Sequence, residues 1–286
     1  KMAAKKKNLS IFSWCLYDWA NTAFGTVIIT FIYSVYFAKG IIGDETAGAS
    51  LWAYAIGVSG LLIALSSPIF GAIADHTGAR KPWIAAFTIL CAACTALLWI
   101  GVPQAEPHLI WLVLIALICA NFGLEMGTVF YNAMLPDLVA RERMGRLSGL
   151  AWGMGYLGGL CCLVVALFGL VGMGAIPPLL PLPTEHAQNI RAAAPLTALW
   201  MILFALPLFV WTPDRPRSPV PYRAAIRNGL SSLLTTLRGL RHQGNMLRFL
   251  IASAIYRDGL NTLFAVGGLY AAGQFGMQFE EILIFA

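Results

Sequence analysis

The sequence predicts an all-α polytopic membrane protein, and three observations carry that prediction. Of its 286 residues, 59% are hydrophobic and only 11% are charged, whereas a soluble domain carries about 25% charged residues. Apolar runs long enough to cross about 30 Å of hydrocarbon recur along the whole chain. The basic residues fall mainly into alternate connections between these runs. Such a chain has too few charges to cover a soluble surface, so lipid is its expected solvent.

The apolar runs predict seven complete membrane helices and the start of another. The first run, Ile11 to Ala38, follows a basic start like that of a secretory signal, but it is too long for a signal peptide. We therefore expect a retained first helix. An eighth helix is expected to begin near Phe279 and is cut off at Ala286, so the chain is expected to be a fragment. The seven complete helices are expected near residues 11–38, 52–74, 83–102, 109–135, 147–172, 195–211 and 248–275.

The distribution of basic residues predicts the orientation. Of the 19 Lys and Arg residues, 16 fall on the side that holds the N-terminus, which the positive-inside rule assigns to the cytoplasm. The other side receives only Lys39 and Arg191, and Arg257 lies within a span. This asymmetry accounts for the net charge of +6 without a nucleic-acid partner.

The connection at 212–247 is expected to divide an N-terminal six-helix bundle, 1–211, from the start of a second bundle, 248–286. It opens with four prolines, which favour an extended strap. Apolar residues then recur at helical spacing with arginines between them, from Ile226 to Arg241. We expect a basic amphipathic helix along the cytoplasmic membrane surface. A calmodulin-type partner site is the weaker alternative.

Metal and catalytic chemistry find little support in the sequence. All six cysteines lie in apolar runs, and the Cys91-x-x-Cys94 spacing is accompanied by no second pair and no histidine. The four histidines are scattered through connections, without the clustering that a membrane-embedded transferase needs. We expect the cysteines to be small buried apolar residues, and we expect no metal, no cofactor and no enzymatic activity.

Four charged residues fall at membrane depth: Asp18, Glu125, Arg257 and Asp258. A charge there costs at least about 2.5–3.5 kcal/mol on insertion scales, so each needs a function or a partner. They occur only in the first, fourth and seventh expected helices. Such polar positions are expected to face a bundle interior or a water-filled cavity. A polar clamp, with Arg257 neutralising Glu125, is the alternative. In the fourth helix Glu125 shares one face with three polar residues, Asn121, Thr128 and Asn132.

Two of these helices contain the same short pattern, Asp-x-x-Asn-Thr-x-Phe. The second copy follows the first by 240 residues at all four positions. Chance in a biased composition is the alternative, but four matches at fixed spacing favour an internal repeat. If the two helices are equivalent, Asp18 and Asp258 face one cavity from opposite sides, near the level of Glu125 and the membrane midplane. The two copies are Asp18, Asn21, Thr22, Phe24 and Asp258, Asn261, Thr262, Phe264.

The fifth expected helix is rich in glycine. Gly149 and Gly153, and again Gly155 and Gly159, are four residues apart. Small residues at this spacing let two membrane helices approach closely. We expect this helix to pack tightly against a neighbour.

The connection after the second helix reads Gly71-Ala72-Ile73-Ala74-Asp75-His76-Thr77-Gly78-Ala79-Arg80-Lys81. It resembles the signature of the major facilitator superfamily between its second and third helices, Gly-x-Leu-Ala-Asp-Arg-x-Gly-Arg-Arg/Lys. An ordinary basic loop with a turn glycine is the alternative. Asp75 is expected to lock a cytoplasmic interface by charge. The expected conformational gating loop comprises Gly71, Asp75, Gly78, Arg80 and Lys81.

Further stretches narrow the resemblance. Residues 13–24 and 130–137, followed by 146–149 and 155–159, resemble the vacuole-effluxer-like branch of that superfamily, which includes fungal amino-acid effluxers and related bacterial permeases. The resemblance implies a major-facilitator-type helix bundle, here the first six-helix half and the start of the second half. In that family helices 1, 4, 7 and 10 line the central cavity. The resemblance also implies a secondary active transporter that moves a small solute, with amino acids as the implied class, by alternating access.

The expected site combines the resemblance with the charges found at membrane depth. Glu125 or Asp18 is the candidate to carry a coupling proton, and Arg257 is the candidate to meet a substrate carboxylate. The expected partners are a small-molecule solute, the lipid bilayer and protons, and the protein is expected to be a monomer. Its expected location is the cytoplasmic (inner) membrane of a bacterium or the vacuolar membrane of a fungus. The alternatives are a transporter of another solute, such as a drug or sugar, a non-transporting sensor or scaffold, and a membrane-embedded transferase. The expected site residues are Asp18, Asn21, Asn121, Glu125, Arg257, Asp258 and Asn261.

Overall fold

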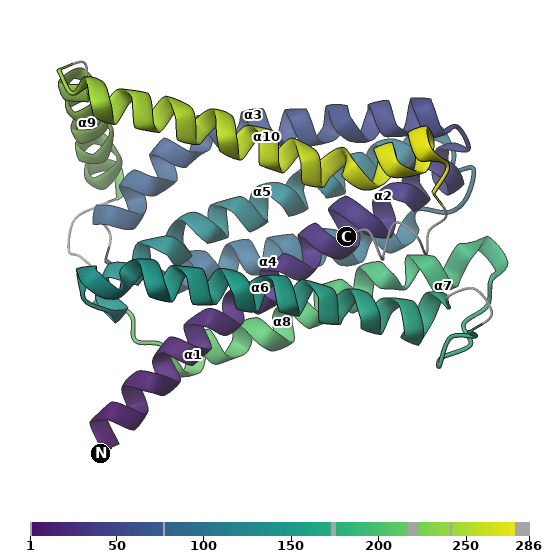
Figure 1. The fold of residues 1–286 in the computed structure, drawn as a ribbon, viewed down its shortest axis with the longest axis horizontal. Helices are drawn as coiled ribbons and strands as arrows, with labels where there is room; N and C mark the ends of the chain where they lie inside the picture. Colours follow the sequence, from purple (N-terminus) through teal and green to yellow (C-terminus); the bar gives the residue numbers. More distant parts are fainter. Residues whose placement is uncertain (1, 77, 173–175, 217–221, 241, 278–286) are drawn as a thin grey trace.

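The protein is all-helical, as the sequence predicts (Figure 1). The computed structural model describes residues 2–76, 78–172, 176–216, 222–240 and 242–277. The expected eighth helix lies outside the described residues. In chain order the elements are α1 (Met2–Ala23), η1 (Phe24–Phe31), α2 (Tyr33–Tyr36), η2 (Phe37–Ile42), α3 (Glu45–His76), α4 (Lys81–Leu97), η3 (Leu98–Ile100), α5 (Pro107–Leu138), η4 (Arg141–Arg143), α6 (Met144–Ala166), η5 (Leu167–Val171), η6 (Glu185–Ala187), α7 (Gln188–Arg191), α8 (Ala193–Trp211), α9 (Tyr222–Leu240) and α10 (Gly244–Phe275).

Within the described part of the chain, six helical segments are long and apolar enough to cross a membrane. Each overlaps one of the first six expected helices. The six segments lie side by side in one bundle, and the chain alternates between its two ends (Figure 1). The segments are Lys6–Ile42, Glu45–Asp75, Lys81–Ile100, Pro107–Leu138, Arg141–Val171 and Glu185–Trp211.

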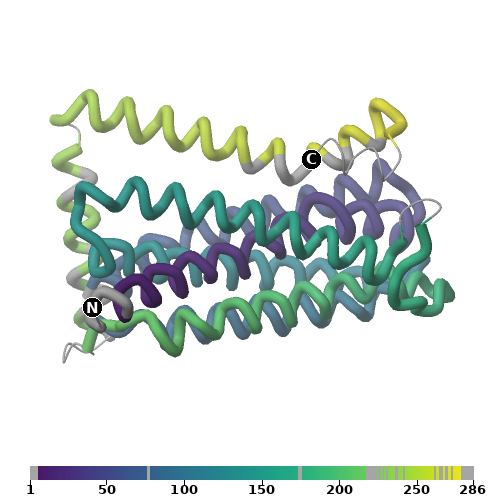
Figure 2. Tube along the Cα trace, turned by 60° about the horizontal axis from the view of Figure 1, so that its bottom comes forward, coloured from purple at the N-terminus to yellow at the C-terminus, as the bar shows by residue number. Residues whose placement is uncertain are grey.

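The seventh expected span forms α10, a continuous α-helix of 32 residues. It is not among the six described segments apolar enough to cross a membrane. Most of α10 is exposed, and it touches the bundle near its C-terminal end, where Ala271 packs against Phe31. Figure 2 shows α10 lying above the bundle and separated from it along the preceding part.

The first span departs from a regular α-helix. Its middle is a π-helix, Phe24–Phe31, and a second π-helical stretch follows at Phe37–Ile42. In a π-helix each N–H bonds to the carbonyl five residues earlier, and the Ile32 N–H accordingly donates to the Val27 carbonyl over 3.0 Å. The polar side chains of α1 therefore precede a change in helical register.

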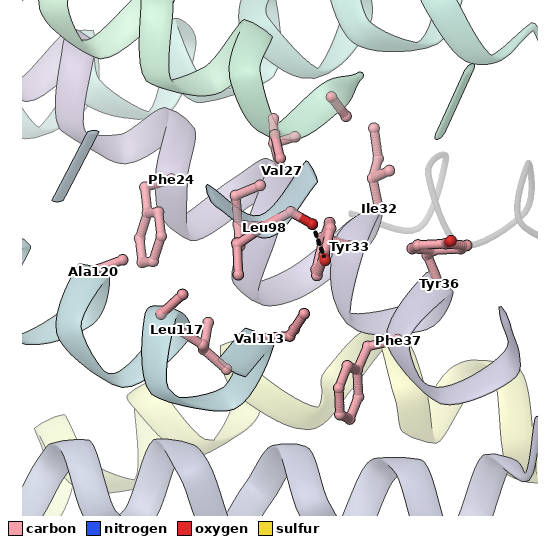
Figure 3. Close-up of a cluster of buried hydrophobic side chains, with 14 of the residues drawn as sticks. Phe24, Val27, Ile32, Tyr33, Tyr36, Phe37, Leu98, Val113, Leu117 and Ala120 are labelled. Carbon is pink, nitrogen blue, oxygen red and sulfur yellow. Dashed lines mark hydrogen bonds between the residues drawn. The ribbon is translucent and has the colours of Figure 1, made fainter. Parts of the chain in front are cut away.

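A large apolar cluster fills the bundle towards the end opposite the N-terminus (Figure 3). Phe24, Tyr33 and Phe37 from the first span are fully buried in it together with Leu117 from α5. Tyr33 donates its hydroxyl to the Leu98 carbonyl over 2.5 Å. Between membrane helices such side chains stabilise the bundle by van der Waals packing rather than by removal from water. This cluster contains buried residues from all six spans.

Glycines bring α6 against α1, as the sequence predicts for one of its two glycine pairs. A Cβ added at Gly155 would lie 2.6 Å from the Thr22 hydroxyl oxygen, and one added at Gly158 would lie 2.5 Å from the Trp19 carbonyl oxygen. Gly159 is packed against Thr26 in the same way. The other predicted pair, Gly149 and Gly153, is exposed and has no atom within 4 Å of an added Cβ. Only the later half of the glycine-rich stretch therefore makes the close contact that both pairs were expected to make.

Candidate functional site

The crossing of α1 and α5 is built from aromatic residues. The rings of Trp14 and Tyr131 stack with centroids 4.3 Å apart and planes 9° from parallel. The Trp14 indole N–H donates to the Tyr131 carbonyl over 3.3 Å, and the Tyr131 hydroxyl reaches the Trp14 carbonyl at 3.1 Å. Tyr17, one turn further along, shares a 2.8 Å hydrogen bond with Thr88 on α4. These contacts hold α1, α4 and α5 together next to Asp18, the first predicted site residue.

Asp18 receives a hydrogen bond from this aromatic frame. The Tyr131 hydroxyl is 3.0 Å from Oδ2 of Asp18, and the Asp18 side chain is partly buried. Asn21, the next predicted residue on α1, is 7% exposed, and its Oδ1 has no hydrogen-bond partner among the described residues. A buried amide oxygen without a partner costs about 1–3 kcal/mol. Asp18 and Asn21 thus place a carboxylate and an unpaired amide oxygen within one turn of α1.

The polar stripe of α5 points towards two different helices. Asn121 donates its side-chain N–H to the fully buried Ser59 hydroxyl of α3 over 2.9 Å. Glu125, one turn later, is exposed to solvent and lies close enough to Arg257 of α10 for electrostatic attraction. Among the salt bridges of the described residues, none joins a nitrogen of Arg257 to a carboxylate oxygen of Glu125 within 4.0 Å. Glu125 and Arg257 thus carry opposite charges on two helices, α5 and α10, without direct contact.

The second copy of the repeat lies on α10. Asp258 is exposed and forms no ion pair with any described residue. The side chain of Asn261 lies outside the described residues. Tyr131, the partner of Asp18, is six residues further along α5 than Glu125, a distance of about 9 Å along the axis. That Asp18, Glu125 and Asp258 open onto one space at one level stays a prediction.

The expected gating loop contains one residue, Arg80, that forms an ion pair with a distant residue among those described. The guanidinium of Arg80, only 5% exposed, lies 2.5 Å from the carboxylate of Asp137 at the end of α5, and Arg215 pairs with the other oxygen of the same carboxylate. Asp75, in contrast, is exposed and forms no ion pair with the described residues. Gly78 adopts a left-handed backbone conformation, φ 79°, as a turn glycine does.

Asp214 completes this junction, although the sequence did not single it out. Its carboxylate accepts the backbone N–H groups of Arg80 and Lys81 over 3.0–3.1 Å at the N-terminus of α4. A carboxylate there satisfies orphan donors and is favoured by the helix dipole. The Lys81 ammonium bonds to the Phe209 carbonyl over 2.8 Å. The segment after α8 is therefore bound to the start of α4 through Asp214 and to the end of α5 through Arg215.

At the opposite end of the bundle, a basic residue is buried. Arg191 is 7% exposed and donates to the carbonyls of Trp99 and His186, with its guanidinium 4.6 Å from the centre of the Trp99 ring. In the sequence Arg191 stands out only as a charge in a connection, so the burial of its side chain was not predicted. The sequence signal for Tyr131 was similarly weak, because a tyrosine in an apolar run resembles many others. No group of three or more candidate metal ligands occurs within the described residues.

Comparison with known proteins shows that one protein family matches most of this chain. A family described as "Vacuole effluxer Atg22 like" matches residues 34–285. The chain is 28% identical over 276 residues to "Uncharacterized MFS-type transporter YxiO" of Bacillus subtilis, covering 95% of this chain and 62% of that relative. It is 22% identical over 153 residues to "Autophagy-related protein 22" of Yarrowia lipolytica, covering 46% of this chain and 24% of that relative. The chain thus spans less than two thirds of the length of these relatives.

Among solved structures, the chain resembles the partially occluded inward open conformation of the xylose transporter XylE from E. coli. The TM-score is 0.58 at 15% sequence identity, covering 97% of this chain and 68% of that chain. A D-xylose-proton symporter is similar with a TM-score of 0.53 at 14% identity, covering 97% and 63%. At such low identity the likeness concerns the fold, which is the major-facilitator-type bundle expected from the sequence.

Proposed function

This chain belongs to the family of vacuole effluxer Atg22-like proteins, and from that membership we propose that it acts in a secondary transporter moving a small solute by alternating access. It is a multi-pass integral membrane protein with a major-facilitator-type fold. Family and fold point to a transporter rather than to an enzyme. The proposed solute is an amino acid.

The observation that carries this proposal is the pair of opposite charges on α5 and α10. Glu125 and Arg257 are near enough to attract each other, yet they are not in direct contact. A zwitterion can satisfy both kinds of charge at once: its ammonium group with Glu125 or Asp18, and its carboxylate with Arg257. Asn21 offers a further hydrogen-bond acceptor. Asn121, Asp258 and Asn261 remain proposed members of the site.

Proton coupling is part of the proposal. Carboxyl groups at membrane depth recur in proton relays of transporters because they can exchange a proton with the substrate pathway. Asp18 is the stronger candidate, because the Tyr131 hydroxyl can donate to it when it is charged and accept from it when it is neutral. Glu125 is the second candidate, because it too is a carboxyl group within a membrane span.

The proposed organisation follows the sequence. Residues 1–211 form the N-terminal bundle, 212–247 the connection and 248–286 the start of the second bundle. The end at which α1 begins is proposed to face the cytoplasm, because the basic residues gather there. The proposed membrane is the inner membrane of a bacterium or the vacuolar membrane of a fungus. One copy is proposed to suffice for transport.

Flux measurements with the complete protein in proteoliposomes test this function. We expect uptake or counterflow of neutral amino acids, strongly reduced by Asp18→Asn and by Arg257→Gln. Asp44→Asn is the matched control, since Asp44 lies on a connection and its amide can keep the bond to the Ala47 N–H. Flux of a drug or sugar instead would replace the substrate class, and no solute flux from a folded protein would favour a sensor or scaffold.

A further inference from the structure

Helix α9 crosses the end of the bundle. In Figures 1 and 2 it runs across the direction of the six spans, at the end where α1 begins. Spans that cross a membrane place its plane perpendicular to the bundle axis. A helix that lies across their ends is therefore parallel to the plane of the bilayer.

The depth of α9 follows from its contact with α3. Gly229 is buried against Ala72, and an added Cβ would lie 2.9 Å from the Ala72 Cα and closer still to its Cβ. Ala72 lies four residues before the end of α3 at His76, a distance of about 6 Å along the helix. α9 thus sits beside the last turn of a membrane span rather than beyond it. That depth is the headgroup region of a bilayer.

The exposed face of α9 carries cations and one apolar side chain. Arg227, Leu234 and Arg238 are spaced seven and four residues apart, so they share one helical face. All three are exposed, Leu234 to 54%. The sequence contains no acidic residue between Asp214 and Asp258. No negative side chain within this segment therefore offsets the positive charge of Arg227 and Arg238.

We propose that this face of α9 binds anionic phospholipid headgroups of the leaflet at this end of the bundle. Arg227 and Arg238 contact headgroup phosphates and carboxylates, and Leu234 enters the boundary with the acyl chains. Charge complementarity and the depth of α9 both identify this occupant, because the headgroup region is where an interfacial basic helix lies. The helix then anchors the connection between the two halves to the membrane surface. This role is independent of which solute is carried.

Hydrogen exchange of the full chain in nanodiscs tests the proposal. The discs contain phosphatidylcholine alone or phosphatidylcholine mixed with phosphatidylserine. We expect amides of α9 to exchange more slowly in the anionic discs, and we expect high salt to remove the difference. Arg227→Gln with Arg238→Gln should remove most of it, since each arginine contributes about fivefold to binding an anionic surface. Amides of the six spans report whether each variant is folded.

A matched control separates α9 from general positive charge. Arg141→Gln with Arg143→Gln removes two exposed arginines at the same end of the bundle but away from α9, and it should leave the difference intact. Equal exchange of α9 in both kinds of disc would overturn the proposal and favour a protein partner for this face. Persistence of the difference in the α9 double variant would overturn it as well.

Discussion

The hydroxyl of Tyr131 on α5 donates a 3.0 Å hydrogen bond to the carboxylate of Asp18 on α1. The ring of Tyr131 is fully buried and stacked on Trp14, so its hydroxyl oxygen is held between the Asp18 carboxylate and the Trp14 carbonyl, and its one proton can be donated to either. A carboxylate at membrane depth is thereby held in place by a neutral donor rather than by a cation. A neutral partner lets the carboxyl group change its protonation state without leaving a second charge unpaired.

We expect Tyr131→Phe to reduce flux several-fold while lowering the stability by about 1 kcal/mol, the net value of one hydrogen bond. The substitution keeps the stack on Trp14 and removes only the donor. Proteoliposome flux and the thermal unfolding midpoint are the two measurements. Tyr54→Phe, at an exposed position of α3, should change neither. Flux with the same magnitude and pH dependence in a folded Tyr131→Phe protein would contradict the assigned role of Asp18.

We expect Asp214→Ala to lower the unfolding midpoint more than Asp75→Ala. Asp214 accepts two backbone N–H groups at the start of α4, a contact whose removal costs about 0.5–2 kcal/mol at helix N-termini. Asp75 is exposed, so its replacement should leave stability nearly unchanged. Equal midpoints for both alanine variants would show that Asp214 does not secure the junction.

Gly158→Leu should disrupt the contact between α1 and α6, because the new side chain would meet the carbonyl and the ring of Trp19. Overpacking of this kind costs about 1–3 kcal/mol. Gly153→Leu on the same helix adds the same atoms into open space and serves as the control. Thermal unfolding in detergent is the measurement. A Gly153→Leu protein as unstable as Gly158→Leu would mean that helix flexibility, and not packing, explains the glycines.

The predicted orientation can be checked by labelling. Ala140 and Thr184 are exposed. Ala140 lies in the connection between α5 and α6 and Thr184 in the connection before α7, and these two connections are at opposite ends of the bundle (Figure 1). We expect an impermeant thiol reagent added outside intact cells to label Thr184→Cys but not Ala140→Cys, in a background without the native cysteines. Labelling in permeabilised cells confirms that both sites react. The reverse pattern would place the N-terminus outside.

The spans were predictable because lipid imposes a simple rule on their composition. The first expected helix, 11–38, lies within the observed Lys6–Ile42, and the fourth, 109–135, lies within Pro107–Leu138. The π-helical stretches were not predictable, since apolar residues in a row fit an α-helix and a π-helix equally well. Their position depends on which side chains the neighbouring spans accommodate.

The candidate site was only partly visible in the sequence. Membrane depth made Asp18, Glu125 and Arg257 conspicuous, because charge there is costly. The partners could not be found in the same way. Tyr131 is one tyrosine in an apolar run, and Asp214 follows a proline in a connection, where an acidic residue has no cost. Their importance comes from contacts more than one hundred residues away along the chain.

The π-helical stretch in the first span has a consequence for how the two halves of the protein are aligned. It begins at Phe24, the last residue of the first repeat copy, whereas α10 continues as an α-helix beyond Phe264. Each widened turn holds an additional residue. Pairing residues by a constant offset of 240 therefore equates side-chain directions only up to Phe24. If the predicted repeat holds, an alignment of its two copies needs a gap after Phe24, because the π-helical stretch follows the first copy and not the second.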